Sequence, residues 1–285
     1  MSIEWDIPEE LLQQAAEAIV QADALLIGAG AGMGVDSGLP DFRGNKGFWN
    51  AYPPFQKRGL SFIDMANPKW FYNEPEVAWG FYGHRLHLYR DTVPHEGFSV
   101  LRRFAKDMTH GAFVYTSNVD GQFQKAGFDD EQIVECHGSI HHMQCALPCA
   151  SHIWDGHSEV VEVDEETFEA SPPMPACRHC GYMARPNILM FGDGMWIAKR
   201  TTEQERRYKK WLASLTGHVV VIECGAGTAI PSVRWACEGV TKRAGGTLIR
   251  INPREAYGPA GILSFECGAL RALSAIEERV QELRA

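Results

Sequence analysis

The sequence contains no apolar run long enough to cross a membrane, and its opening segment, MSIEWDIPEELL, is acidic and lacks the apolar core of a secretory signal. Basic residues are also few: 27 lysines and arginines stand against 36 aspartates and glutamates, for a net charge of −9. A chain of this sign is a poor partner for the phosphate backbone of a nucleic acid. We therefore expect a cytoplasmic protein with no membrane partner and no direct nucleic-acid partner.

Internal repeats are absent as well. Cysteine is present in eight copies, but without a secretory signal these residues favour metal ligands or free thiols over disulfides. With 285 residues, 45% of them hydrophobic and 22% charged, the chain has the composition of a globular protein. This length allows one large domain, or one large domain with a small insert.

A glycine-rich stretch at residues 25–44, LLIGAGAGMGVDSGLPDFRG, stands out first. The apolar run 25–27 predicts a buried strand of a parallel sheet, and the glycines after it predict a loop where a ligand can approach the backbone. Backbone N–H groups in such a loop bind phosphate, so we expect a nucleotide site. The usual dinucleotide fingerprint, G-x-G-x-x-G, fails in every register, and the acidic residue expected about 20 positions further on is missing.

Strand and helix patterns alternate along the rest of the chain. Further buried strands are predicted at 112–116, 133–136, 219–222 and 247–251, and helices at 8–22, 61–65, 75–89, 95–108, 201–215, 232–244 and 269–283. This alternation predicts an α/β fold with a Rossmann-like, doubly wound parallel sheet. We assign residues 1–44, 94–142 and 184–285 to this domain, 45–93 to a helical, aromatic-rich lid, and 143–183 to a small insert.

The cysteines of the predicted insert form two short pairs, Cys145-x3-Cys149 and Cys177-x2-Cys180. Two such pairs across a long gap can bring four thiolates to one tetrahedral zinc ion, with no position left open for water. We therefore predict one structural zinc ion per chain. The alternative is four free thiols.

The segment from Gly30 to Arg43 resembles the sirtuin family of NAD-dependent protein deacylases. The family's pattern G-A-G-I-S-x-x-S-G-I-P-D-F-R overlays it without a gap. Sirtuins also carry a comparable four-cysteine zinc ribbon, although their first pair is usually C-x2-C. The resemblance covers most of the chain, from about residue 25 to residue 273. It implies NAD as co-substrate, a structural zinc ion, and acyl-lysine proteins or peptides as partners.

The resemblance also assigns residues that hold the NAD. They are Gly30, Ala31, Gly32, Asp41, Phe42, Arg43, Ser117, Asn118, Val119, Asp120, Gly225, Ala226, Gly227, Asn252 and Cys267. Gly30, Ala31 and Gly32 would meet the pyrophosphate through their backbone, and Phe42 would shield the reacting ribose carbon C1′. Asp120 would accept a hydrogen bond from the nicotinamide amide. Taken alone, the 117–121 segment could be an ordinary turn.

Two catalytic residues follow from the same resemblance, Asn118 and His137. Asn118 would hold the ribose and a catalytic water, and His137 would act as general base on a ribose hydroxyl after the acyl oxygen has attacked C1′. The implied products are nicotinamide, free lysine and O-acyl-ADP-ribose. The nearby His141 and His142 are expected at the surface or at the junction with the insert.

Two further segments resemble the family's substrate site. Phe191-Gly192 matches the F-G of a segment that binds the substrate as an added strand. Tyr82 and Arg85 share one helix face, and in one branch of sirtuins such a Tyr-x-x-Arg binds the carboxylate of succinyl-lysine. The alternative is a surface arginine beside a packed tyrosine. The chain would thus be a deacetylase, and possibly a desuccinylase.

The sequence departs from the family's pattern at Gly34, Ser117, Phe123 and the Ala226-Gly227 pair, all on loops expected to face the cofactor. Two other functions therefore stay open. One is an NAD hydrolase or ADP-ribosyltransferase that uses the same pocket. The other is a non-catalytic NAD- or ADP-ribose-binding module. Retention of Asn118, Asp120 and His137 together argues against the binding module.

Overall fold

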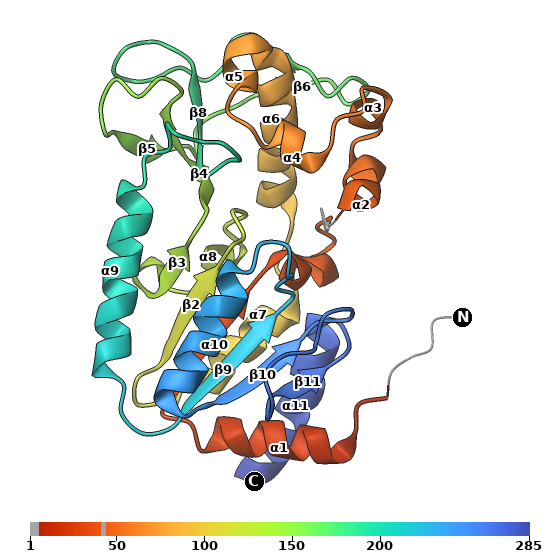
Figure 1. The fold of residues 1–285 in the computed structure, drawn as a ribbon, viewed down its shortest axis with the longest axis vertical. Coiled ribbons are helices and arrows are strands. Elements are labelled where there is room, and N and C mark those ends of the chain that lie inside the picture. Colours follow the sequence, from red (N-terminus) through yellow and green to blue (C-terminus); the bar gives the residue numbers. More distant parts are fainter. Residues whose placement is uncertain (1–5, 41–43) are drawn as a thin grey trace.

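A computed structural model describes residues 6–40 and 44–285 (Figure 1). The larger lobe, in the lower half of Figure 1, is built on a six-stranded parallel sheet with helices on both faces. The smaller lobe above it contains helices α2 to α6 and a three-stranded antiparallel sheet. No helix in the described ranges is both long enough and apolar enough to cross a bilayer.

The parallel sheet has the strand order β11-β10-β9-β1-β2-β3. Its members are β1 (Ala24–Ala29), β2 (Ala112–Thr116), β3 (Ile133–Glu135), β9 (Val219–Cys224), β10 (Thr247–Ile251) and β11 (Leu263–Phe265). The central strands β1 and β9 are buried at every position. Continuous burial is expected where helices cover both faces of a parallel sheet.

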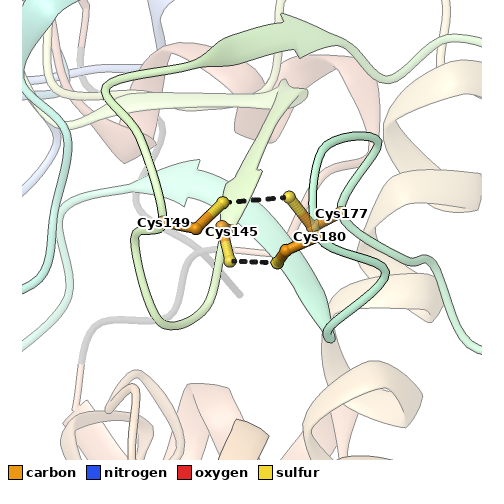
Figure 2. Close-up of side chains that lie close together, drawn as sticks. All are labelled: Cys145, Cys149, Cys177 and Cys180. Atoms are coloured by element: carbon orange, nitrogen blue, oxygen red, sulfur yellow. Dashed lines mark hydrogen bonds between the residues drawn. The ribbon is translucent and has the colours of Figure 1, made fainter.

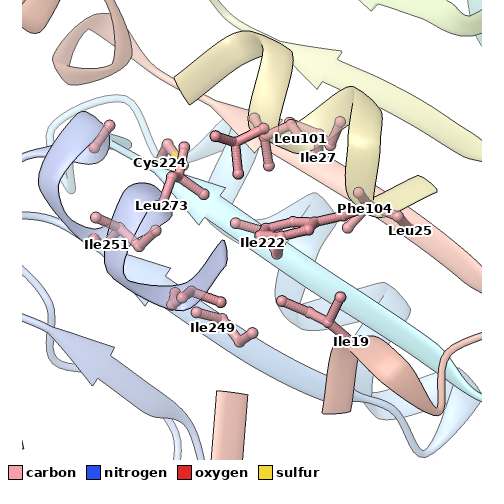
Figure 3. Close-up of a cluster of buried hydrophobic side chains, with 14 of the residues drawn as sticks. Ile19, Leu25, Ile27, Leu101, Phe104, Ile222, Cys224, Ile249, Ile251 and Leu273 are labelled. Carbon is pink, nitrogen blue, oxygen red and sulfur yellow. The ribbon is translucent and has the colours of Figure 1, made fainter. Parts of the chain in front are cut away.

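Helices cover the two faces of this sheet in separate groups. One face carries α1 (Glu9–Val20), α7 (Glu96–Ala105) and α11 (Ala269–Arg284), and the other carries α9 (Lys199–Ser214) and α10 (Ser232–Ala244). Because side chains alternate along a strand, Leu25 and Ile27 pack beneath the first group (Figure 3), whereas Leu26 packs beneath the second. The large lobe therefore has two hydrophobic cores, one on each side of the sheet.

The small lobe combines two stretches of the chain. Its helices are α2 (Gly44–Ala51), α3 (Pro53–Lys57), α4 (Phe62–Met65), α5 (Trp70–Asn73) and α6 (Pro75–Asp91), and its strands are β4 (Gly138–Cys145), β5 (Ile153–Asp155), β6 (Glu162–Val163), β7 (Ala170–Ser171) and β8 (Ala184–Ile188). Phe81 of α6 and Met143 of β4 belong to the same buried cluster. The lid helices and the antiparallel sheet thus share one core. The remaining short helices are η1 (Ala31–Ser37), α8 (Gln122–Lys125) and η2 (Asp130–Gln132).

The predicted Rossmann-like sheet is confirmed, with two differences. A sixth strand, β11, was not predicted, because three residues are too few to show a pattern. Residues 138–142 and 184–188, which we had assigned to the Rossmann-like domain, pair instead within the antiparallel sheet. The chain enters that sheet through Gly138, whose φ is +78° and where a Cβ atom would lie 2.0 Å from the Asn187 carbonyl oxygen.

Candidate active site

The parallel strands end level with one another. Ala29 at the end of β1 is aligned with Thr116 of β2 and with Cys224 of β9, and Thr116 is aligned with Glu135 of β3. The loops that leave these strands therefore begin side by side at one edge of the sheet, where open α/β sheets bind ligands. They are the loops in which the sequence predicts most of the cofactor-binding residues.

A cavity of about 1200 Å³ is lined by residues of both lobes. The predicted site residues in its lining are Gly30, Ala31, Tyr82, Arg85, Ser117, Asn118, Val119, Asp120, His137, Phe191, Gly192 and Gly227. The predicted cofactor residues that do not line it are Gly32, Gly225, Ala226, Asn252 and Cys267. Asp41, Phe42 and Arg43 lie outside the described residues. One cavity thus collects both predicted catalytic residues and all four predicted substrate residues.

The glycine loop is packed against the loop after β9. A Cβ atom at Gly30 would lie 2.7 Å from the Ala226 Cα, and one at Gly32 would lie 2.7 Å from the Gly225 Cα. The N–H groups of Gly30 and Gly32 donate to the carbonyls of Cys224 and Gly225, at 3.0 and 3.1 Å. These two N–H groups are therefore engaged within the protein. Ala31 lines the cavity, and its N–H makes no hydrogen bond to another described residue.

Asn118 is held by both neighbouring strand ends. Its backbone N–H donates to the Thr116 hydroxyl, and its side-chain Nδ2 donates to the Gly30 carbonyl, each at 3.0 Å. The Thr116 hydroxyl in turn donates to the Ala29 carbonyl at 3.0 Å. The side-chain oxygen of Asn118 is left to accept a hydrogen bond from a ligand.

Asp120 is a buried carboxylate in the cavity lining. Burial raises its pKa from 3.8 to about 6, more than the hydrogen bond from the Gln122 backbone N–H lowers it. The Asp120 carbonyl accepts a hydrogen bond from Nε2 of His141 at 3.0 Å, and the His141 ring lies against Gly121, whose φ is +70°. His141 is thus half-buried behind the site. Nothing in the sequence pattern around it indicates this contact.

His137 follows β3 and lines the cavity. Burial lowers the pKa of His137, more than a hydrogen bond to the Ser117 backbone raises it, so the ring is neutral near pH 7. The His137 carbonyl accepts a hydrogen bond from the Leu189 N–H at 2.9 Å. This bond ties the His137 backbone to the segment that follows β8. A neutral, half-buried imidazole in a cavity is suited to accept a proton.

Asn252 has a structural position. It is fully buried, and its Nδ2 donates to the Ala226 carbonyl at 2.9 Å. Its Oδ1 accepts from the N–H groups of Arg254 and Glu255, both at 3.0 Å. Asn252 thereby holds the rim of the cavity without lining it. Arg254, Glu255 and Thr228 line the cavity instead, and the Thr228 hydroxyl donates to the Glu255 carboxylate at 2.5 Å.

The Phe191-Gly192 loop is anchored by a buried ion pair. Nη1 and Nη2 of Arg185 contact the two carboxylate oxygens of Asp193 at 2.8 and 2.9 Å, and both side chains are 0% exposed. The Phe191 N–H donates to the Ala66 carbonyl at 2.9 Å, which joins the loop to α4. The loop is therefore held rigidly along one wall of the cavity.

Tyr82 and Arg85 reach the cavity from α6. Arg85 is only 6% exposed, so the alternative of a surface arginine is wrong. Its Nε and Nη2 donate to the Tyr89 hydroxyl at 3.0 and 2.7 Å, and its guanidinium lies over the rings of Tyr82 and Phe81. Tyr89 also lines the cavity. It is one helical turn beyond Arg85, so the helix period could have identified it from the sequence.

The departures from the sirtuin pattern occupy different environments. Ser117 and Gly227 line the cavity. Phe123 is buried in the core against Phe98 and Phe128, and Gly34 packs on Leu39. Gly34, Phe123 and Ala226 do not line the cavity, although the sequence places them on loops expected to face the cofactor.

The four predicted metal ligands converge in the small lobe (Figure 2). Their sulfur atoms all lie within 4.8 Å of one another, and the pairs Cys145–Cys180 and Cys149–Cys177 are 3.8 Å apart. A tetrahedron with Zn–S bonds of about 2.3 Å has sulfur–sulfur edges of about 3.8 Å. The cluster therefore fits one four-coordinate zinc ion, and the sulfur separations exclude disulfide bonds.

Comparison with known proteins identifies the family of this chain. A model of the Sir2 family matches residues 30–214. An NAD-dependent protein deacylase of Aquifex aeolicus is 27% identical over 79% of this chain and 82% of its own length. The solved NAD complex of a Sir2 homologue has a similar fold, with a TM-score of 0.71 at 23% identity over 98% of this chain and 96% of that one. Sir2Tm bound to a propionylated peptide gives a TM-score of 0.67 at 19% identity, over 94% and 97%. Because the family model covers more than half of its length, the chain belongs to the Sir2 family.

Proposed function

We propose that this chain is an NAD-dependent protein-lysine deacylase, which transfers an acyl group from lysine to ADP-ribose and releases nicotinamide. The observation that carries the proposal is the meeting of Asn118, Asp120 and His137 with the Phe191-Gly192 loop in one cavity. Membership of the Sir2 family and similarity to an NAD-dependent protein deacylase support it.

The cavity has the chemistry that a dinucleotide needs. At about 1200 Å³ it exceeds the usual volume of small-ligand pockets, up to about 1000 Å³, and so has room for NAD and an acyl side chain. Ala31 would meet the pyrophosphate with its backbone N–H, Asn118 would bind ribose with its amide oxygen, and Asp120 would accept from the nicotinamide amide. When bound, NAD would supply an electrophilic ribose carbon and nicotinamide as the leaving group.

His137 would then act as the general base. Its ring lines the cavity and its pKa is lowered by burial, so a ring nitrogen would be available to take a proton from a ribose hydroxyl. Burial keeps this nitrogen unprotonated at neutral pH. The surrounding wall, which includes Phe62 and Leu189, would exclude water from the reacting groups.

The acyl-lysine substrate would enter along the Phe191-Gly192 loop. An extended peptide there would pair with the loop through main-chain hydrogen bonds, which give affinity with little sequence selectivity. The acyl group would point towards Tyr82 and Arg85 on α6. A guanidinium at that end suits an acyl group with a terminal carboxylate, so succinyl-lysine is proposed as a substrate beside acetyl-lysine.

The four cysteines would hold one structural zinc ion. All four ligands are thiolates, so no coordination position is open for a substrate. The ion would tie together the loops between β4 and β8, and the Phe191-Gly192 loop follows β8 directly; the ion would take no part in the chemistry.

One incubation tests the proposal against its alternatives. The protein is given NAD alone, NAD with an acetyl-lysine peptide, or NAD with a succinyl-lysine peptide, and the products are identified by mass. O-acyl-ADP-ribose that forms only with peptide supports the deacylase. Loss of NAD without peptide indicates a hydrolase, ADP-ribose on protein indicates a transferase, and NAD binding without turnover indicates a binding module.

A further inference from the structure

The last residue of β3, Glu135, is held by helix α9 through its backbone N–H, its carbonyl and one oxygen of its carboxylate. Its carboxylate pairs with Nη2 of Arg200 at 2.5 Å. Its carbonyl accepts a hydrogen bond from the Thr201 hydroxyl at 3.1 Å, and its N–H donates to Oε1 of Gln204 at 3.1 Å. In the described ranges, these three α9 side chains make hydrogen bonds to Glu135 and to no other residue. The contacts thus form one clamp, which we define as Arg200, Thr201 and Gln204.

The clamp acts on the segment that leads directly to His137. Glu135 is 1% exposed, and Cys136, which follows it, donates from its N–H to the Thr116 carbonyl at 2.9 Å. The end of β3 is therefore fixed by α9 on one side and by β2 on the other. His137 comes next, before the chain turns at Gly138. The place where the His137 ring enters the cavity follows from where this strand ends.

The ion pair with Arg200 also compensates the charge of the buried Glu135 carboxylate. A buried carboxylate that loses its cation leaves an uncompensated charge in the interior, which the protein relieves by moving the group towards water. Because Glu135 is only 1% exposed, its carboxylate cannot reach water from its present position. The Glu135 charge also reaches the site, because it is among the causes that raise the pKa of Asp120, after burial.

We infer that Arg200, Thr201 and Gln204 are positioning residues for His137. They fix Glu135, two residues upstream, and so determine where the His137 ring lies in the cavity. The inference rests on the proposed role of His137 as general base. None of the three lines the cavity. They would act only through the position of His137, so their effect is expected on the chemical step. The NAD contacts proposed for Ala31 and Asn118 lie on the loops after β1 and β2, and NAD affinity should change little.

Kinetics on three clamp variants test this. Arg200→Met and Thr201→Val should lower kcat by about 10- to 100-fold while KM for NAD stays within about twofold, because small displacements of a reacting group are costly. Arg200→Lys restores a cation beside Glu135 and should recover most of the activity. The matched control is Arg206→Met on the same helix, which removes an exposed pair with Glu203 and should leave kcat unchanged.

The His137 imidazole signal in an NMR spectrum gives a second readout that needs no turnover, with assignment by His137→Gln. We expect this signal to shift in Arg200→Met and Thr201→Val, and to stay in place in Arg206→Met. If Arg200→Met does not fold, the near-isosteric Thr201→Val carries the test. An inactive wild-type protein would refute the proposed function. The NMR comparison would still test whether the clamp positions His137. Variants that fold with an unchanged His137 signal, or with unchanged kcat, would overturn the inference.

Discussion

The side-chain amide of Asn118 donates a hydrogen bond to the Gly30 carbonyl over 3.0 Å, and this bond joins the loop after β2 to the loop after β1. The same side chain lines the cavity, so in the proposed function it would link cofactor binding to the shape of the glycine loop. Asn118→Ala should therefore lower kcat/KM for NAD by about 100-fold, because it removes a ligand contact and loosens the loop. Steady-state kinetics measure this. Asn50→Ala, on the exposed side of α2, is the control and should behave as wild type.

The raised pKa of Asp120 predicts that folding stability and NAD affinity depend on pH in opposite directions. Its pKa is raised from 3.8 to about 6 by burial, so the folded protein binds more protons than the unfolded chain between these values. The free energy of unfolding should therefore fall as pH rises through that window. Asp120→Asn should be more stable than wild type at pH 7.5, by at most about 3 kcal/mol, and by about 1 kcal/mol less at pH 5. Urea unfolding at the two pH values measures the difference.

NAD binding should respond to Asp120 in the opposite direction. The carboxylate is the proposed acceptor for the nicotinamide amide, so wild-type affinity should weaken as pH falls below about 6. Asp120→Asn should bind NAD weakly at every pH. Calorimetric titration with NAD checks both statements, with the exposed Asp107→Asn as control. An Asp120→Asn protein that bound NAD as tightly as wild type would refute the assigned contact.

The buried Arg185–Asp193 pair should cost far more to break than an exposed ion pair. Arg185→Met leaves a carboxylate that is 0% exposed without its cation, so the free energy of unfolding should drop by about 3 to 5 kcal/mol. The exposed Arg58–Glu74 pair gives the comparison, since Arg58→Met should cost less than about 1 kcal/mol. Denaturant unfolding of both variants measures the costs. Similar losses would mean that the buried pair does not anchor the Phe191-Gly192 loop.

Metal removal should dismantle the small lobe selectively. We expect one zinc ion per chain by elemental analysis, and none after Cys177→Ser, because three thiolates bind zinc far more weakly than four. Loss of the ion should abolish peptide binding and lower the melting temperature. Cys136→Ser, outside the cluster, should keep the full metal content. A metal-free wild type with an unchanged melting temperature would contradict a structural role.

Acyl preference should depend on Arg85. Arg85→Met should lose desuccinylation by about 10-fold or more and keep most deacetylation, because only the longer acyl group carries a carboxylate to pair with the guanidinium. Tyr89→Phe removes the hydroxyl that holds Nε and Nη2 and should weaken desuccinylation less. Rates with the two peptides, measured side by side, separate these effects. Equal loss of both activities would show that Arg85 supports the fold of the cavity and not the choice of acyl group.

Much of the large lobe could be predicted from the sequence because its strands are continuous apolar runs. The strands 112–116 and 247–251 and the helix 232–244 have the predicted bounds. The antiparallel sheet was missed, since β4 and β8 pair across a long insert, and a sequence pattern does not reveal which distant strands meet. The three-residue β11 is too short to show a period.

The site was predictable where a residue's chemistry and its motif coincide. Asn118, Asp120 and His137 line one cavity, and the four cysteines of the insert converge in a separate cluster. Asn252, which the resemblance assigns to the NAD, does not line the cavity, and its motif does not tell whether its amide faces a ligand or the neighbouring backbone. His141, expected at the surface or at the junction with the insert, is half-buried against the Asp120 carbonyl, a contact that is set by how two loops pack.

Strand β1 lies between β2 and β9, and Ala24 pairs with Val219. The lid, the cysteine-bearing insert and α9 are therefore synthesised before β9, the second strand that pairs with β1. Until then, a wholly apolar strand has one open edge, which is a template for unwanted pairing with other chains. Nascent chains of this protein should consequently depend on holding chaperones during synthesis, and truncation anywhere before β9 should yield aggregates, not a smaller folded enzyme.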